Sequence, residues 1–379
     1  MRTRLFLIIA SLAVGFFIIR WQQPALSAGT NEFVWTAKYT GQNLRYPTGL
    51  FKVPSANGGP AANLIFIADT GNNQIKMFQA GAGITTIAGS GTAGSADGSP
   101  TTAQFNGPTG ILGPGYVTLA NPQHTDYSAA YLLNVVDTNN HSIRRVCKEI
   151  KVAVGGAAIC GASSSVTTIA NSSNSLNAPA LGVPIYTLNG VRYLADSATH
   201  TIAQVDTSNS VSVFAGAFNT PGYADGALTQ ARFTGPTKIA AGPTNVFYVA
   251  DVGNFRIREI NGSTVSTLAG NGQRGYVDGP GSEAEFSLPT SMAYDPTDGS
   301  VYVADAGNYC IRRIDSAGNV TTYAGSNSAG NVDGSLTSAR FGAPTDIIID
   351  GRVMYVSDAT NHSIRKIDMN AQTVATFIN

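Results

Sequence analysis

Histidine is the residue type in this sequence whose placement comes nearest to a metal-binding pattern. Three of the four histidines, His141, His200 and His362, each lie four residues after an Asp in a repeated phrase. Zinc binds imidazole nitrogen at about 2.0–2.1 Å, so one ion would need all three rings at a single point. Equivalent positions of a repeat are instead spread around the molecule when the repeats form a ring. We therefore expect these histidines to occupy turns and to hold no metal.

The phrase around these histidines occurs six times. Each copy has an Asp, usually an Asn three residues later, then Ile and, in five copies, a basic residue. The intervals between successive Asp fall from 68 to 53 residues along the chain, and a period of this size indicates a repeat architecture. The acidic positions are Asp69, Asp137, Asp196, Asp251, Asp305 and Asp358. The basic positions are Lys76, Arg144, Arg258, Arg312 and Arg365.

Two interpretations of these charged side chains stay open. In the first, each Asp caps a turn and each basic residue pairs with a nearby carboxylate, so that the set is structural. In the second, the set forms a polar rim that contacts a ligand over the mouth of a channel. Because the two signs nearly balance, such a rim would not attract its ligand by net charge.

About four strands per repeat are expected to position this phrase. An apolar run precedes each Asp, a second strand opens at the Ile, and a third strand rich in Thr and Val follows. Four linkers between repeats carry Asp-Gly, Ala, Phe and Pro-Thr at constant offsets, and the Pro-Thr pair opens the next strand. We expect the linker Phe to be buried between repeats rather than to stack on a ligand. These residues are Phe105, Phe233, Phe286 and Phe341.

The repeat resembles the NHL-repeat family of β-propellers, whose hallmark is a strand ending Tyr-Val-Ala-Asp, then Gly-Asn and Ile-Arg-Arg-Ile. The segments from Tyr302 to Ile314 and from Phe247 to Ile260 match closely. The resemblance covers roughly residues 45–379 and implies an all-β, six-bladed β-propeller with four-stranded antiparallel blades around a central channel. It indicates function poorly, because NHL propellers bind proteins, bind RNA or catalyse reactions.

The expected organisation is a leader, residues 1–28, followed by one propeller, residues 29–379. Blade 2 carries a long insertion around residues 113–130, and blade 3 has Thr199 and Ala203 in place of the usual Asn and basic residue. The segment 33–40 is expected to form a strand against the C-terminal blade and to help close the ring. The approximate blades are 45–90, 105–170, 178–216, 234–270, 287–325 and 342–379.

The N-terminus has the pattern of a targeting segment. Arg2 and Arg4 precede the apolar stretch 5–19, and small residues follow at 25–28. This stretch suits a signal peptide better than a span, which needs about 20 residues. We expect cleavage near Ala28, with an uncleaved membrane anchor as the alternative. In either case the propeller is expected outside the cytoplasm: secreted, periplasmic or anchored facing outwards.

Cysteine usage is consistent with an oxidising compartment. Cys147 and Cys160 lie 13 residues apart and flank the long outer hairpin of blade 2. We expect a disulfide between them, with two buried free thiols as the alternative. Cys310 is expected to be an unpaired, packed thiol.

Charge excludes one class of partner. Charged residues make up 12% of the chain and the formal net charge is +0, whereas a nucleic-acid binder needs a basic surface. We expect a monomer with no nucleic-acid partner, and membrane contact only through an uncleaved N-terminal segment.

The central channel is where an enzyme of this fold would place its site. Lys238 and Asp346 are the best candidates for channel-facing charges, with Asp295 and Asp350 further along the inner strands. None of the five Glu lies on an expected inner strand. This is little material for the calcium site of gluconolactonase-like propellers or the zinc site of the peptidyl-hydroxyglycine amidating lyase, an enzyme branch of the NHL family. A metal-dependent hydrolase or lyase, using calcium or zinc, is nevertheless the alternative function.

The favoured function is a non-enzymatic, exported binding scaffold without a cofactor. Its irregular places are the best candidates for a surface that binds a protein or glycan, because loops carry function on such scaffolds. In the blade 2 insertion these candidates are Tyr116, His124, Tyr127 and Tyr131. Asp346 and Lys238 are the candidates in the channel.

Overall fold

The structure of the chain is a computed structural model. It describes residues 43–53, 64–120, 127–151, 158–161, 163–171, 185–186 and 191–379, all within one compact unit, Lys38–Asn379. Within this part of the chain, no helix is long and apolar enough to cross a membrane. The expected leader and the expected strand at 33–40 lie outside the described residues.

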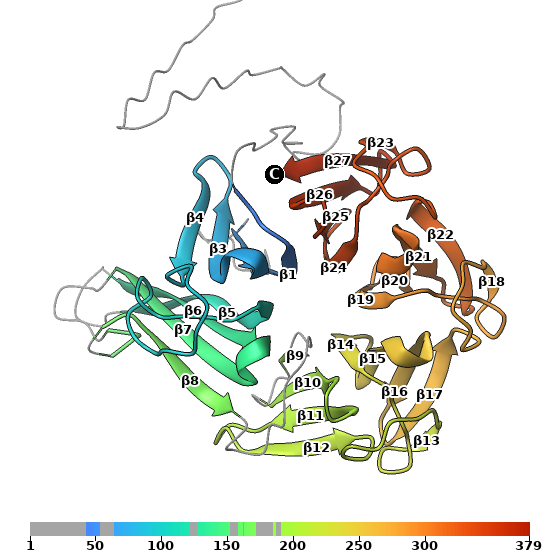
Figure 1. The fold of residues 1–379 in the computed structure, drawn as a ribbon, viewed down its shortest axis with the longest axis horizontal. Coiled ribbons are helices and arrows are strands. Elements are labelled where there is room, and N and C mark those ends of the chain that lie inside the picture. The colour runs from blue at the N-terminus through green and yellow to red at the C-terminus, as the bar shows by residue number, and fades with distance from the viewer. Residues whose placement is uncertain are drawn as a thin grey trace, which may run out of the picture. The chain divides into compact units, whose positions relative to one another are not determined.

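Six antiparallel sheets surround a central axis and form a six-bladed β-propeller, as the repeat predicted (Figure 1). Blade 1 contains β1 (Pro47–Lys52), β2 (Leu64–Asp69), β3 (Gln74–Gln79) and β4 (Gly83–Ala88). Blade 2 contains β5 (Pro108–Ala120), β6 (Tyr127–Asp137), β7 (Ser142–Lys151) and β8 (Ser165–Asn171). Blade 3 contains β9 (Ile185–Tyr186), β10 (Arg192–Asp196), β11 (Thr201–Val205) and β12 (Val211–Ala215).

Blades 4 to 6 each have a fifth, two-residue strand at the outer edge, where the sequence predicted four strands. Blade 4 contains β13 (Gly226–Ala227), β14 (Pro236–Ala241), β15 (Val246–Asp251), β16 (Arg256–Asn261) and β17 (Thr264–Ala269). Blade 5 contains β18 (Gly279–Pro280), β19 (Pro289–Asp295), β20 (Ser300–Asp305), β21 (Cys310–Ile314) and β22 (Asn319–Gly325). Blade 6 contains β23 (Gly334–Ser335), β24 (Pro344–Asp350), β25 (Val353–Asp358), β26 (Ser363–Asp368) and β27 (Thr373–Ile378).

The extra strand comes from the Asp-Gly linker. Its glycine has a φ of +133° to +147° in Gly226, Gly279 and Gly334, a conformation that side chains rarely adopt. This lets the linker turn and pair with the outermost strand, for example Gly279 with Val320. The linker thereby covers part of a sheet edge that would otherwise stay open.

Short 3₁₀ turns follow the second strand of four blades and hold the repeated phrase. They are η2 (Thr70–Asn72), η3 (Thr138–Asn140), η5 (Val252–Asn254) and η6 (Ala306–Asn308). The residue after each turn is left-handed, with φ between 49° and 54°. The four linker Phe are fully buried in clusters shared by neighbouring blades, which confirms their predicted packing role.

The ring closes between blades 1 and 6 by packing and hydrogen bonds. Leu50, Ile65 and Phe78 of blade 1 share a buried cluster with Phe377 and Ile378 of blade 6. The Thr of the Pro-Thr pair also links neighbouring blades. The hydroxyl of Thr237 donates to Thr290 O at 2.9 Å, and that of Thr290 donates to Pro344 O at 3.3 Å.

Candidate functional site

The inner strands bring Lys238 of β14 and Asp346 of β24 together across the channel. Lys238 Nζ lies 2.8 Å from Asp346 Oδ1, and the two residues are 7% and 1% exposed. They are 108 positions apart in the chain, and the arrangement of blades 4 to 6 around the axis places them side by side.

Both oxygens of the Asp346 carboxylate are already hydrogen-bonded. Its Oδ1 also accepts from Ser291 Oγ at 2.6 Å and from the Ile347 N–H at 3.0 Å, while Oδ2 accepts from the Leu50 N–H at 2.8 Å. Lys238, Ser291, Asp346 and Leu50 belong to blades 4, 5, 6 and 1, so this axial cluster joins four blades. An ion that binds Oδ1 would have to displace these partners.

The other described carboxylates on inner strands are also paired with cations. Asp350 Oδ2 lies 2.6 Å from Lys52 Nζ, and Asp295 Oδ2 lies 2.9 Å from Arg352. Calcium prefers six to eight oxygen ligands, many of them charged. These three carboxylates, each neutralised by a lysine or arginine, therefore do not fit the alternative calcium site on the axis.

The repeated Asp and Arg are buried and form ion triads with a third, partly exposed Asp of the linker between blades. In blade 5, Arg312 lies 3.2 Å from Asp305 and 2.6 Å from Asp278, and it donates to the carbonyls of Glu285 and Val277. The same triad recurs in blades 2, 4 and 6. Its members there are Asp137, Arg144 and Asp97; Asp251, Arg258 and Asp225; and Asp358, Arg365 and Asp333.

The triads favour the structural interpretation over the polar rim. The four arginines are 0% exposed, so they do not face a ligand over the channel mouth. Each arginine also lies over the linker Phe, as Arg312 does over Phe286 at 5.1 Å. The sequence analysis missed the linker Asp as the third member, although its distance from the Arg, 32 to 34 residues in blades 4 to 6, was a visible signal.

The phrase Asp does not cap its own turn in these four blades, which corrects the expectation from sequence. Asp305 Oδ1 instead accepts the N–H groups of Ser287 and Leu288 in the loop before β19. Asp305 Oδ2 is occupied by Asn308 Nδ2 at 2.6 Å and by Arg312. Burial raises the pKa of Asp137, Asp251 and Asp305, although these hydrogen bonds and the arginine charge oppose the shift.

Blades 1 and 3 depart from the triad. Lys76 Nζ reaches Asp69 at 2.6 Å and the carbonyl of Asn43 at 3.1 Å. In blade 3 the carboxylate of Asp196 has no basic partner at position 203 and accepts the N–H groups of Ala198 and Thr199. Burial raises the pKa of Asp196 above its ordinary value.

The histidines occupy the left-handed position of the repeat turn, as expected, with φ of 49°, 60° and 53° at His141, His200 and His362. Two of them also bond the next blade. The Gly235 N–H donates to His200 Nδ1 at 3.0 Å, and the Tyr46 N–H donates to His362 Nδ1 at 3.1 Å. Asn73 occupies the same turn position in blade 1, and its Oδ1 accepts the Gly107 N–H of the next blade at 2.9 Å.

Replacement of His362 by Phe is expected to lower the free energy of unfolding by about 1 kcal/mol, because the Tyr46 N–H loses its acceptor. The stability of His362→Asn should stay near that of the unsubstituted chain. Asn73, at the equivalent position of blade 1, accepts such an N–H group, and Asn tolerates left-handed φ. Chemical denaturation of both variants would measure this difference. Equal losses in the two variants would show that the hydrogen bond is unimportant.

The blade 2 candidates lie on a long hairpin. Strands β5 and β6 pair from Pro108 and Asp137 outwards, with Tyr116 opposite Tyr131, and Tyr127 is the first residue of β6. The Tyr131 ring packs edge-on against Phe66 at 5.5 Å, and burial raises its pKa. His124 lies outside the described residues, as do the side chains of Tyr116 and Tyr127.

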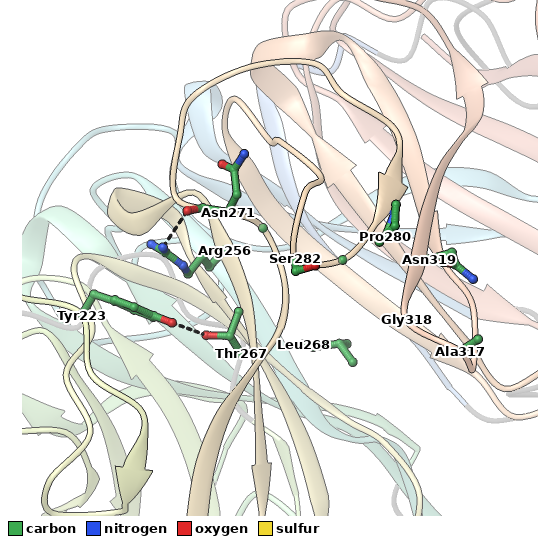
Figure 2. Close-up of a pocket in the computed structure, with 12 residues that line it drawn as sticks. Tyr223, Arg256, Thr267, Leu268, Asn271, Pro280, Ser282, Ala317, Gly318 and Asn319 are labelled. Carbon is green, nitrogen blue, oxygen red and sulfur yellow. Dashed lines mark hydrogen bonds between the residues drawn. The ribbon is translucent and has the colours of Figure 1, made fainter.

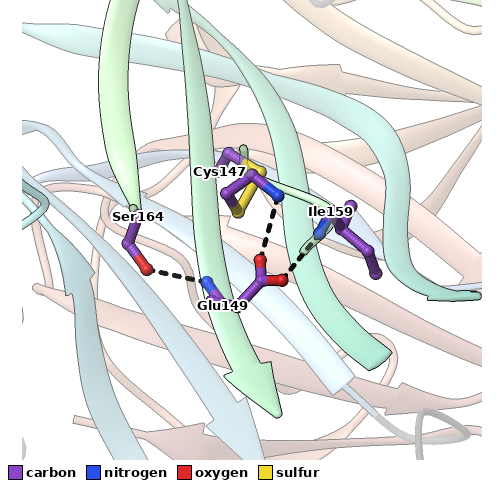
Figure 3. The surroundings of a disulfide bond; sticks show 5 residues. Cys147, Glu149, Ile159 and Ser164 are labelled. Carbon is purple, nitrogen blue, oxygen red and sulfur yellow. Dashed lines mark hydrogen bonds between the residues drawn. A yellow bond between two sulfur atoms is a disulfide. The ribbon is translucent and has the colours of Figure 1, made fainter. Parts of the chain in front are cut away.

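The disulfide predicted from sequence is confirmed between β7 and the connection from β7 to β8, beside this hairpin (Figure 3). It joins Cys147 of β7 to Cys160, whose Cα atoms are 5.5 Å apart. Glu149 lies beside it, and its carboxylate accepts the N–H groups of Ile159 and Cys160 at 2.7 and 3.0 Å. Cys310 is a buried free thiol, as expected, and burial raises its pKa.

A shallow groove of about 550 Å³ runs along the outer edge of blade 4 towards the β21–β22 turn (Figure 2). The Tyr223 ring on its wall lies under Arg256 at 3.8 Å, and the Tyr223 hydroxyl bonds Thr267 Oγ1 at 3.0 Å. Arg256 also donates to Asn271 O at 2.8 Å. Because these polar groups already contact one another, few of them are available to bind a ligand in the groove.

The architecture and the turn geometry define a six-bladed propeller built from one repeat. The NHL repeat family matches residues 233–260 and 286–314, within blades 4 and 5. The chain belongs to the NHL-repeat β-propellers.

Known proteins extend this similarity over most of the chain. NHL repeat-containing protein 2 of Bos taurus is 27% identical over 352 residues, which are 83% of this chain and 46% of that protein. The chloroplastic protein SUPPRESSOR OF QUENCHING 1 of Arabidopsis thaliana is 30% identical over 195 residues, which are 49% of this chain and 18% of that protein. The match thus spans about half the length of NHL repeat-containing protein 2 and 18% of the plant protein.

A solved structure supports the fold alone. A protein of unknown function from Bacteroides thetaiotaomicron superposes with a TM-score of 0.58 at 19% identity, covering 88% of this chain and 70% of that one.

Proposed function

We propose that this chain is an exported, non-enzymatic binding scaffold that presents its loop faces, above all the blade 2 hairpin, to a protein or glycan partner. The observation that carries the proposal is the length of the two strands of this hairpin, β5 and β6, and of the neighbouring strand β7. Strands β5, β6 and β7 have 13, 11 and 10 residues. The corresponding strands of blade 5, β19 to β21, have 7, 6 and 5. The extension is also the part that carries the disulfide.

The axis supports a binding role over catalysis. A hydrolase or lyase site would need a carboxylate available to bind a metal or to move a proton. Asp295, Asp346 and Asp350 are each engaged by a cation, and Asp346 accepts three further hydrogen bonds. These contacts hold the blades together, so the loops are the part of the chain that we expect to bind a partner.

Export is supported by the charged and apolar pattern of residues 1–28 and by the disulfide. Disulfides persist mainly outside the cytoplasm, where the environment is oxidising. The formal net charge of +0 and the absence of a basic run in the sequence favour a protein or glycan over a nucleic acid.

A photo-crosslinking residue in place of Ile150 tests the proposal in the source cells. Ile150 lies on β7 and is 47% exposed. Val213 on β12 is 44% exposed and provides a matched control on another blade. We expect discrete adducts at position 150 and few at position 213, and digestion with protease or glycosidase would identify the class of partner.

Equal adducts at both positions, or none at position 150, would contradict the proposal. A purified chain with an intact disulfide that retains one calcium or zinc ion after dialysis would favour the hydrolase or lyase alternative instead.

A further inference from the structure

Three side chains with metal-binding atoms meet beside the blade 2 hairpin. Cys147 and Glu149 are two residues apart on β7, so their side chains leave the strand on the same face. Cys160 approaches from the following loop. One ligand atom from each of the three residues lies within 4.8 Å of the other two.

The carboxylate is held in place by the backbone around it. Oε1 of Glu149 accepts the Ile159 N–H, Oε2 accepts the Cys160 N–H, and the Glu149 N–H donates to Ser164 Oγ at 2.8 Å (Figure 3). Each carboxylate oxygen has a second lone pair that these bonds leave available. Hydrogen bonds of this kind orient a ligand before a metal arrives.

We propose that reduction of the Cys147–Cys160 disulfide opens a site for one zinc-like divalent cation. A dithiol reductant supplies two electrons and two protons, the S–S bond breaks to give two thiols, and the reductant becomes a cyclic disulfide. Cation binding then releases the two thiol protons to solvent, because only thiolates coordinate. The ligands are the two sulfurs and the Glu149 carboxylate, with water in a fourth position.

The donor set determines the class of cation. Two thiolates and one carboxylate suit zinc and cobalt, which accept tetrahedral sulfur and oxygen ligands. Calcium and magnesium prefer oxygen alone. This site is independent of the proposed partner binding, since the oxidised hairpin needs no metal.

Cobalt titration of the purified full chain tests the proposal. The Cys310→Ser background removes the third thiol, and Ser occupies the equivalent position at Ser142 and Ser363. We expect the reduced chain to bind one cobalt ion with sulfur-to-cobalt charge-transfer absorption, which zinc displaces and calcium does not. The oxidised chain should bind none.

Glu149→Gln distinguishes the proposed site from a simple pair of thiols. Its affinity for cobalt should fall at least about tenfold while the charge-transfer bands remain. Glu283→Gln, at an exposed carboxylate of the blade 4–5 linker, should change nothing. Oxidised Glu149→Gln should keep the β-sheet circular dichroism of the oxidised parent, which shows that the fold is kept, although its amide cannot accept both the Ile159 and the Cys160 N–H groups.

Three results would overturn the proposal. These are no stoichiometric cobalt on the reduced chain, equal affinity in Glu149→Gln, or loss of the β-sheet circular dichroism on reduction alone, because the site needs β7 in place.

Discussion

Replacement of Arg312 by Met is expected to lower the free energy of unfolding by about 3–5 kcal/mol, because it leaves the buried carboxylate of Asp305 without its cation. Arg312 is 0% exposed and contacts Asp305 and Asp278 as well as two backbone carbonyls. Chemical denaturation followed by circular dichroism measures the loss.

Arg313→Met is the matched control, one residue further along β21. Its side chain is 36% exposed and lies 3.7 Å from Asp298, so the ion pair is accessible to water. The expected loss is within about 1 kcal/mol. Similar losses in the two variants would show that the triad does not govern stability.

The loss in Arg312→Met should also depend on pH. Burial already raises the pKa of Asp305, and removal of the arginine charge raises it further above its unfolded value. A raised folded pKa gives stability that is present below the unfolded pKa and lost as pH rises through the folded one. The deficit should therefore be smaller at about pH 5 than at about pH 8. A deficit that grows in acid would contradict this assignment.

Lys238→Met should have a comparable effect, a loss of about 3–5 kcal/mol, because Asp346 would keep a buried charge without its cation. The further substitution Asp346→Asn removes that charge and retains an acceptor for Ser291. We expect the double variant to recover part of the loss, although its amide would meet the Leu50 N–H less well.

Lys52→Met provides the control for this pair. Lys52 also lies on an inner strand, but the Asp350 side chain is 33% exposed and can regain water. The expected loss is no more than about 1 kcal/mol. The axial cluster would then contribute little to stability if Lys238→Met lost as little free energy of unfolding as Lys52→Met. A double variant less stable than Lys238→Met alone would also contradict this prediction.

Local patterns explain how much of the fold was predictable. The repeated Asp, the Tyr-Val-Ala strand and the Pro-Thr pair each act within a few residues, so their spacing predicted six blades and buried linker Phe such as Phe286. The fifth strand was not predicted, because it requires the left-handed Gly279 to bring its linker against Val320, about 40 residues later.

Site prediction was weaker for a related reason. The Cys147–Cys160 pair was recognisable from its spacing, but Glu149 beside it was not, since nothing in the sequence shows where the loop after β7 returns. Lys238 and Asp346 were recognised as channel-facing charges. That they neutralise each other follows only from the structure.

The amino-acid sequence alone thus determined the repeat, the blade number, the buried Phe and the disulfide, because these depend on short-range periodicity and on residue type. Tertiary structure was needed to reveal that Asp278 completes the Arg312 triad and that Lys238 meets Asp346. The packing of successive blades around the axis brings residues 34 and 108 positions apart into contact, and burial makes a missing partner costly. Those contacts make the channel-facing charges part of the framework that holds the blades together.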